Sequence, residues 1–207
     1  MSLARVIEND KRADFSLDLL RGEEGEFAVS EWLASLKNVR EVIDCRKLPE
    51  WQKKDVDFLV NVSCEVRVGF ERTVAWEVKT DNYPDINGTL SYEIISNFQR
   101  GTIGCALKTS ADYLGFYCPQ SSRLLYWKTQ LLRDWVALQA TSFEMIKVFN
   151  YHAGSKDHQV TLCLKIPVAQ ALAGAKGREV VINPSNRVKH DEELTGFVWN
   201  LEKEVDY

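Results

Sequence analysis

The stretch TVAWEVKT (73–80) decides how the fold is read, because its valine, tryptophan and threonine residues favour a β-strand. Side chains alternate between the two faces of a strand, so Glu77 and Lys79 share one face, while Trp76 and Val78 share the other. Glu77-x-Lys79 is the one Glu-x-Lys or Asp-x-Lys pattern in the sequence. It predicts an acid and an ammonium group side by side on a sheet.

A second acid lies on the stretch before this strand. Asp57 opens VDFLVNV (56–62), and that segment and REVIDC (40–45) both have the β-branched and aromatic composition of strands. If Asp57 projects to the face of Glu77, the two carboxylates meet across the ladder, with about 4.5 to 5.5 Å between Cβ atoms. Two such acids repel each other, and a bound divalent cation removes the conflict.

The metal expected between these acids is Mg²⁺, which is held by one or two carboxylates together with substrate phosphate and water. Mn²⁺ is expected to substitute for it. The carbonyl of Val78 could add a further oxygen ligand, and Lys79 could orient a water or stabilise charge on a phosphorus atom. The pattern therefore predicts metal-assisted hydrolysis of a phosphodiester.

A helix is expected before these strands, over about residues 15 to 37. Its apolar residues fall at i, i+3, i+4 and i+7 and form one stripe. The residues of this stripe are Val29, Trp32, Leu33 and Leu36. Glu26 lies closer to the stripe than the neighbouring acids do, so it is expected to point inward. Gly22 and Gly25 project to the same side, where a missing side chain would let the helix approach a sheet closely.

The remaining elements complete an α/β order. The expected elements are a strand ending near Ile95 after an Asn87-Gly88 turn, a helix or irregular crossover over 96–110, strands over 112–118 and 123–128, a helix capped by Thr129, late strands over 147–151 and 158–166, and a short helix after Pro167, followed by a loop and a polar tail. Helix, three strands, crossover and strand predict a mixed β-sheet flanked by helices.

Composition limits the number of domains, the source of phosphate binding and the role of the cysteines. The 207 residues carry a net charge of −4 and contain no repeat, so one domain over 1–207 is expected, and phosphate binding must come from local groups or metal ions. The five cysteines include no C-x-x-C pair and are expected to be reduced core residues. Without a signal sequence or membrane span, the expected location is the cytoplasm, or the host cytoplasm for a viral protein.

Further candidate residues surround the two strands. Lys53, Lys54, Arg100 and Lys108 are candidates for contacts with nucleic-acid phosphates, although a solvated loop is the alternative for Lys108. Asp55 shares a face with Asp57 and could replace it as the metal acid, or could be a solvated turn charge. Glu93 could face the metal site or hold Lys79, or could be an exposed acid on an edge strand.

The chain resembles the PD-(D/E)xK nuclease superfamily. The stretch RGEEGE (21–26) followed by FAVSEWL (27–33) is similar to the opening helix of archaeal Holliday-junction resolvases. The runs EVKTD (77–81), NGTLSYE (87–93) and KTSADYLGFY (108–117) are similar to phage-type small nucleases. By this resemblance the superfamily's helix acid, strand acid and last two motif residues correspond to Glu26, Asp57, Glu77 and Lys79, with Val56 where the literal motif has proline.

The resemblance implies a restriction-endonuclease-like αβββαβ core over about residues 15–130, with a C-terminal elaboration over about 131–207. The expected activity is that of a Mg²⁺-dependent nuclease, a DNA endonuclease, with Glu26, Asp57, Glu77 and Lys79 as its catalytic residues. Two alternatives stay open. One is a Holliday-junction resolvase, which needs a homodimer to cut two strands, and the other is an inactive nuclease fold that binds nucleic acid or a partner protein.

Overall fold

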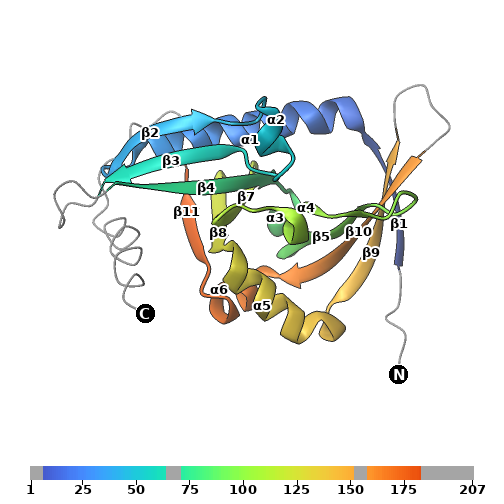
Figure 1. Ribbon diagram of the computed structural model, residues 1–207. Coiled ribbons are helices and arrows are strands. Elements are labelled where there is room, and N and C mark those ends of the chain that lie inside the picture. The colour runs from blue at the N-terminus through green and yellow to red at the C-terminus, as the bar shows by residue number, and fades with distance from the viewer. Residues whose placement is uncertain (1–6, 64–70, 152–157, 183–207) are drawn as a thin grey trace.

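The computed structural model describes residues 7–63, 71–151 and 158–182. The described residues form a six-stranded sheet, in the order β11-β8-β7-β4-β3-β2, and a five-stranded sheet, in the order β1-β9-β10-β5-β6. Helices flank these sheets (Figure 1). The α/β class with a mixed sheet is therefore confirmed.

The six-stranded sheet contains the strands on which the predicted acids lie. β2 (Val39–Asp44), β3 (Phe58–Ser63) and β4 (Glu71–Thr80) form an antiparallel meander, and β7 (Tyr113–Cys118) runs parallel to β4. β8 (Arg123–Lys128) and β11 (Arg178–Val181) extend the sheet with antiparallel pairing. All six residues of β7 are buried, because both faces of the sheet are covered at this point.

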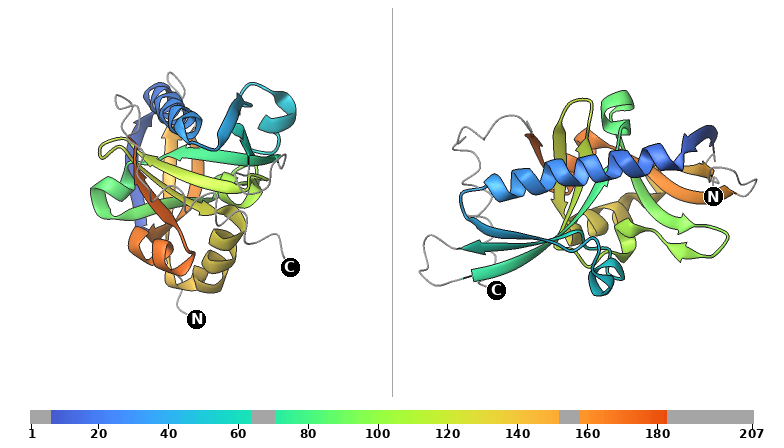
Figure 2. Two further views of the ribbon diagram at one scale, coloured as in Figure 1. Left: turned by 90° about the vertical axis from the view of Figure 1, so that its left-hand side faces the viewer. Right: turned by 90° about the horizontal axis from the view of Figure 1, so that it is seen from above.

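α1 (Phe15–Ser35) covers one face of this sheet and lies across it in the view from above (Figure 2). The predicted apolar stripe is confirmed, since Val29, Trp32, Leu33 and Leu36 are all buried. The ring of Trp32 meets that of Trp76 edge to face, with 6.0 Å between centroids. The helix is therefore fixed to β4, the strand that carries Glu77 and Lys79.

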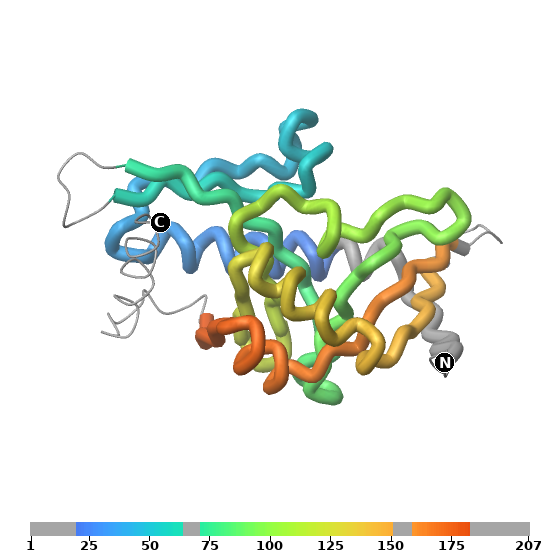
Figure 3. Tube along the Cα trace, turned by 60° about the horizontal axis from the view of Figure 1, so that its bottom comes forward, coloured from blue at the N-terminus to red at the C-terminus, as the bar shows by residue number. Residues whose placement is uncertain are grey.

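The five-stranded sheet lies beside the six-stranded sheet (Figure 1). It consists of β1 (Ile7–Asp14), β5 (Thr89–Asn97), β6 (Thr102–Ile103), β9 (Glu144–Tyr151) and β10 (His158–Pro167). A second apolar cluster joins β5 and β10 to β7 and β8, and α5 (Thr129–Gln139) and α6 (Val168–Gly174) close it. Figure 3 shows these two helices beside the end of the six-stranded sheet.

The connection from β4 to β7 passes through the five-stranded sheet. The chain leaves β4 through α3 (Tyr83–Asn87), forms β5 and β6, and returns through α4 (Cys105–Lys108) to β7. Gly88 ends α3 with φ of 72°, a left-handed conformation in which glycine lacks the steric penalty of other residues. The crossover over 96–110 is thus irregular, with two short elements.

The structure differs from the expected local structure in several places. β1, β11, α2 (Pro49–Gln52), α3 and the 3₁₀ turn over Ala140–Ser142 were not predicted. Thr129 does not cap α5, because Lys128 occupies the N-cap position without a side-chain hydrogen bond and Thr129 is buried. α1, over Phe15–Ser35, confirms the helix expected over about residues 15 to 37. The polar tail, from residue 183 on, lies outside the described residues.

Cys45, Cys105, Cys118 and Cys163 are buried and free, as expected of reduced core cysteines, and Cys64 lies outside the described residues. Among the helices of the described ranges, none has the length and apolar character needed to cross a membrane.

Candidate active site

Glu77 and Lys79 form the centre of the candidate site. Nζ of Lys79 lies 2.8 Å from Oε1 of Glu77, which confirms that the two side chains share one face of β4. Glu77 is only 3% exposed, whereas the side chain of Lys79 is 43% exposed. The buried carboxylate of Glu77 thus contacts a lysine side chain that reaches the surface.

Asp57 lies opposite Glu77, immediately before β3. Its backbone N–H donates to the carbonyl of Trp76 at 2.9 Å, which continues the β3–β4 ladder by one residue. Its Oδ2 accepts a hydrogen bond from the N–H of Val78 at 2.7 Å. The side chain of Asp57 therefore binds the β4 backbone at the point where Glu77 emerges.

Burial makes these two acids reluctant to carry charge together. It raises the pKa of Glu77 to about 8, while the charge of Lys79 lowers that pKa and the charge of Asp57 raises it. Burial also raises the pKa of Asp57, against the hydrogen bond from the N–H of Val78 and the charge of Lys79, which both lower it. Two acids whose charged forms are disfavoured in this way would be stabilised by a cation bound next to them.

Lys79 remains an ammonium group in this setting. Burial opposes its charge, but the negative charge of its neighbours, with Glu77 at hydrogen-bonding distance, raises its pKa above the ordinary value. Lys79 can therefore donate hydrogen bonds and stabilise a nearby anion, and it does not act as a base while it keeps these neighbours.

Glu26 comes from α1 and has a partner that the sequence did not suggest. Its Oε2 lies 2.8 Å from Nη1 of Arg46, and Nη2 of the same guanidinium lies 2.6 Å from Oδ2 of Asp44. Burial raises the pKa of Glu26, the Arg46 hydrogen bond lowers it, and the charge of Asp57 raises it further. Glu26 therefore points inward as expected, near the acid pair but held by Arg46.

Gly25 allows this placement of Glu26. A Cβ atom at Gly25 would lie 2.1 Å from Oγ1 of Thr80, so α1 approaches β4 more closely than any larger residue would allow. The expected close approach is confirmed at Gly25. It is wrong at Gly22, where a Cβ atom would meet nothing within 4 Å.

The donor atoms at Asp57 and Glu77 fit a small divalent cation that keeps several water ligands. Val78 donates its N–H toward Asp57, and the C=O of a strand residue points to the same edge as its N–H, so this carbonyl faces the acid pair. The described residues contain no group of three or more His, Cys, Asp or Glu arranged to hold a metal ion. The groups here that could contribute to holding a divalent ion are the two carboxylates and the Val78 carbonyl, with water as the remaining ligands.

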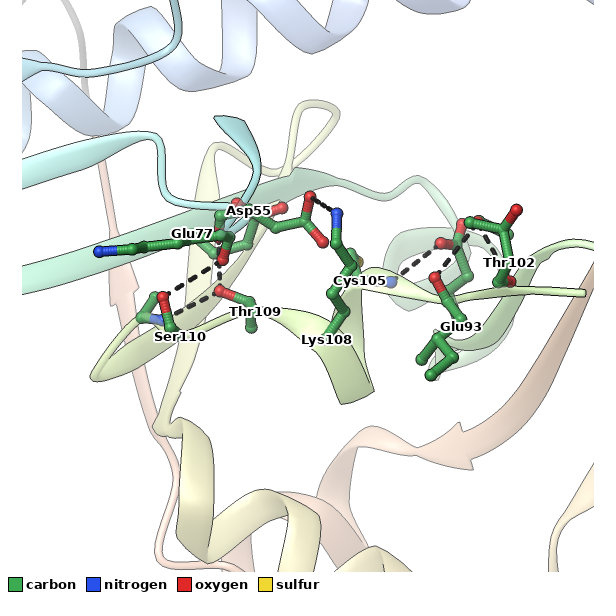
Figure 4. Close-up of polar contacts among 12 residues, drawn as sticks. Asp55, Glu77, Glu93, Thr102, Cys105, Lys108, Thr109 and Ser110 are labelled. Carbon is green, nitrogen blue, oxygen red and sulfur yellow. Dashed lines mark hydrogen bonds and ion pairs between the residues drawn. The ribbon is translucent and has the colours of Figure 1, made fainter. Parts of the chain in front are cut away.

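Asp55 does not join the acid pair. It adopts φ of 48°, and its Oδ1 lies 2.9 Å from Nζ of Lys108. Figure 4 shows Lys108 reaching Asp55 from α4, and the hydroxyl of Thr109 beside the Asp55 carbonyl. Lys108 and Asp55 thus link the crossover to the loop before β3.

The other predicted phosphate contacts lie outside the cleft at the site. Lys53 and Lys54 are exposed, and Nζ of Lys54 lies 4.5 Å above the ring of Trp51. Arg100 is exposed in the turn between β5 and β6. The basic residues that do line the cleft are Arg21, Arg46, Lys47 and Lys79.

This cleft has a volume of about 1410 Å³ and takes its walls from α1, the end of β4, α3, and strands β5, β9 and β10. Glu26, Asp57 and Lys79 line it, so the structure brings three of the four predicted catalytic residues to one cavity, with Glu77 buried behind Lys79. From the five-stranded sheet, sequence reasoning offered Glu93 as a candidate and missed the contributions of β9 and β10.

Glu93 lines the same cleft from β5. Its Oε1 accepts a hydrogen bond from the N–H of Cys105 at 3.1 Å, at the start of α4 (Figure 4). A Cβ atom at Gly104 would lie 2.5 Å from the Glu93 carbonyl oxygen, so glycine is needed for this contact. Since β5 pairs with both β10 and β6, Glu93 is not on an edge strand.

Comparisons of the chain with family models, with curated proteins and with solved structures found no match.

Proposed function

We propose that the protein is a divalent-metal-dependent nuclease that hydrolyses phosphodiester bonds in DNA. The observation that carries this proposal is the junction of Asp57, Glu77 and Lys79 at the cleft. Two acids whose charged forms are disfavoured by burial adjoin an ammonium group on a partly exposed side chain. This combination can bind a cation and an anion next to each other, as hydrolysis of a phosphodiester requires.

The order of elements supports the same proposal. α1, the antiparallel strands β2, β3 and β4, and then β7 parallel to β4 correspond to the αβββαβ core of the PD-(D/E)xK nucleases that the sequence resembles. The second helix of that core has its counterpart in α4, which is only four residues long and follows the excursion through β5 and β6. We therefore propose a restriction-endonuclease-like core with an extended crossover.

In this proposal Asp57 and Glu77 would hold Mg²⁺ or Mn²⁺, with the Val78 carbonyl as a further ligand. The ion would lower the pKa of a water molecule bound to it and would neutralise charge on the substrate phosphate. Lys79 would orient the attacking water and stabilise the negative charge that grows on the phosphorus oxygens. Arg46 would hold Glu26 in place beside this pair and offer its remaining donors to a phosphate.

The test is a cleavage assay with supercoiled plasmid, linear duplex, a four-way junction and single strands of DNA and RNA, with Mg²⁺, Mn²⁺ or a chelator. Glu77→Gln should lower the rate by at least about 100-fold, as loss of a group that acts on the transition state does. Glu144→Gln is the matched control, because Glu144 also pairs with a lysine, Lys165 at 3.2 Å, but lies in the five-stranded sheet. If none of these substrates is cut with any of these ions, the proposal is wrong.

A second candidate is a nuclease fold that binds nucleic acid or a partner without cutting. The observation in its favour is that Glu77 and Glu26 already have cationic partners, Lys79 and Arg46, within the chain. In that case binding should need no divalent ion, and Glu77→Gln should leave it unchanged. A junction resolvase would instead cut the four-way junction in preference to the linear duplex, and as a dimer.

A further inference from the structure

The cleft beside the candidate site is larger than a site for a small molecule. Its volume of about 1410 Å³ exceeds the roughly 300–1,000 Å³ typical of small-molecule pockets. Residues from both sheets and from α1 line it, so it is a built feature of the fold rather than a gap beside one loop. A segment of a polymer is the kind of occupant that such a cleft fits.

The charges that line the cleft are mixed. Arg46 and Lys47 follow β2 and, with Lys79, place positive charge beside the acid pair. Acids line the cleft as well: β5 contributes the carboxylate of Glu93, and Asp81 follows β4. The five acids that line the cleft, Glu23, Glu26, Asp57, Asp81 and Glu93, outnumber its four basic residues.

This arrangement favours a ligand with one phosphate backbone. A duplex carries a backbone on each of its two strands, and a cleft whose acids outnumber its basic residues lacks the positive charge to neutralise a second backbone. A single strand could place its phosphates against Arg46, Lys47 and Lys79 and keep its uncharged bases toward the acids.

The rest of the cleft offers groups that suit unpaired bases. Asn150 of β9 and Thr161 of β10 present neutral polar side chains, and the Asn150–Thr161 hydrogen bond uses one of the two amide donors of Asn150. Phe27 of α1 lines the cleft and is 59% exposed. It follows Glu26 directly, so a base stacked on Phe27 would have its phosphate close to the site.

We propose that this cleft binds an unpaired strand of nucleic acid, with phosphates along Arg46, Lys47 and Lys79 and a base stacked on Phe27. This inference rests on the proposed function, because it names the substrate class of the same site. It makes the enzyme a nuclease for single strands or for unpaired segments of structured DNA.

The test is equilibrium binding of the full chain to a labelled single strand and to a duplex of the same length, in Ca²⁺ and in chelator, with strand integrity checked on a gel. The single strand should bind at least about tenfold more tightly than the duplex in Ca²⁺. Phe27→Ala should weaken single-strand binding by about 5- to 100-fold, as expected for loss of one stacked base, and Phe27→Trp should restore it.

Phe98→Ala is the matched control, because Phe98 is also 59% exposed but does not line the cleft. Single-stranded RNA in a parallel titration shows which sugar the cleft accepts. Equal or tighter binding of the duplex, or unchanged single-strand binding by Phe27→Ala, would overturn the inference. Such a result leaves the catalytic proposal standing if Glu77→Gln still abolishes cutting, so the two failures can be told apart.

Discussion

Nη1 of Arg46 lies 2.8 Å from Oε2 of Glu26, and this contact ties the loop after β2 to the middle of α1. The helix acid that the resemblance assigns to the catalytic site is thus kept in place by a guanidinium from the same chain. Arg46 also lies 5.4 Å from the ring centroid of Phe58, at the start of β3. One side chain therefore orders the helix, the loop and the strand next to Asp57.

Arg46→Met should destabilise the protein, and more strongly at pH 8 than at pH 4. At pH 8 the variant leaves Glu26 charged and without its cation, whereas at pH 4 the carboxyl can take up a proton. We expect a loss of about 1–3 kcal/mol at the higher pH, as for a partly buried charged hydrogen bond. Denaturant unfolding at both pH values measures it.

The control is Arg40→Met, because Arg40 pairs with Glu71 at 3.6 Å on the surface, where ion pairs contribute little. An equal loss in both variants, or a loss in Arg46→Met that does not depend on pH, would contradict the prediction.

Gly25→Ala should lower the free energy of unfolding by about 1–3 kcal/mol, because the new methyl group would overlap Thr80 and force α1 away from β4. Gly22→Ala, in the same helix, should instead be neutral or raise it by up to about 1 kcal/mol, since its Cβ meets nothing and alanine favours the helix. Thermal unfolding of the two variants compares them directly. The close approach of the helix would be doubtful if both substitutions had the same sign.

Asp57→Asn and Asp57→Ala should separate structure from chemistry. Asparagine can keep an oxygen toward the N–H of Val78, so its stability should stay near that of the wild type while metal-dependent cleavage is lost. Alanine leaves that N–H without its partner and should also lower the free energy of unfolding by about 1–3 kcal/mol. Unfolding and cleavage are measured on the same preparations, and cleavage by Asp57→Asn at the wild-type rate would remove Asp57 from the proposed site.

Asp81 should make the folded protein less stable as the pH rises from about 4 to about 6. Burial raises its pKa from 3.8 to about 6, although the N–H groups of Tyr83 and Ser91 donate to it and lower the pKa. The folded state therefore holds the proton in a range where the unfolded state has released it, so the free energy of unfolding falls with pH there. The full effect is at most about 3 kcal/mol, at about 1.4 kcal/mol per pKa unit.

The comparison is with Asp81→Asn, which carries no titratable group at this position. It should be less stable overall, since an amide cannot accept from both N–H groups, but its stability should lack this part of the pH dependence. Curves for the two proteins that run parallel between pH 4 and pH 6 would show that Asp81 does not titrate in this way.

The part of the site that the sequence predicted is the part set by local periodicity. Alternation along one strand places Glu77 beside Lys79, and helical spacing turns Glu26 and the apolar stripe inward. Asp57 lies opposite β4 because β3 and β4 are consecutive in the sequence and pair with each other, which is a short-range relationship.

The contacts that were missed join residues far apart in the chain. Lys108 meets Asp55 across 53 positions, and Arg46 meets Glu26 across 20, so neither follows from the period of a helix or a strand. β1 and β11 pair with strands that are remote in the sequence, β9 and β8. The cleft wall from β9 and β10 likewise depends on how the two sheets come together.

The excursion of the chain between β4 and β7 has a consequence for any attempt to reduce this protein to a minimal fragment. The five-stranded sheet takes its strands from the beginning, the middle and the later part of the described chain. In the sequence, β5 lies between β4 and β7, which are adjacent strands of the six-stranded sheet. A truncation after β8 would strip β10 from β5 and leave an open edge next to Glu93, and such edges promote aggregation. Shortened versions are therefore expected to be insoluble, and circular permutants are the better route to dissecting the molecule.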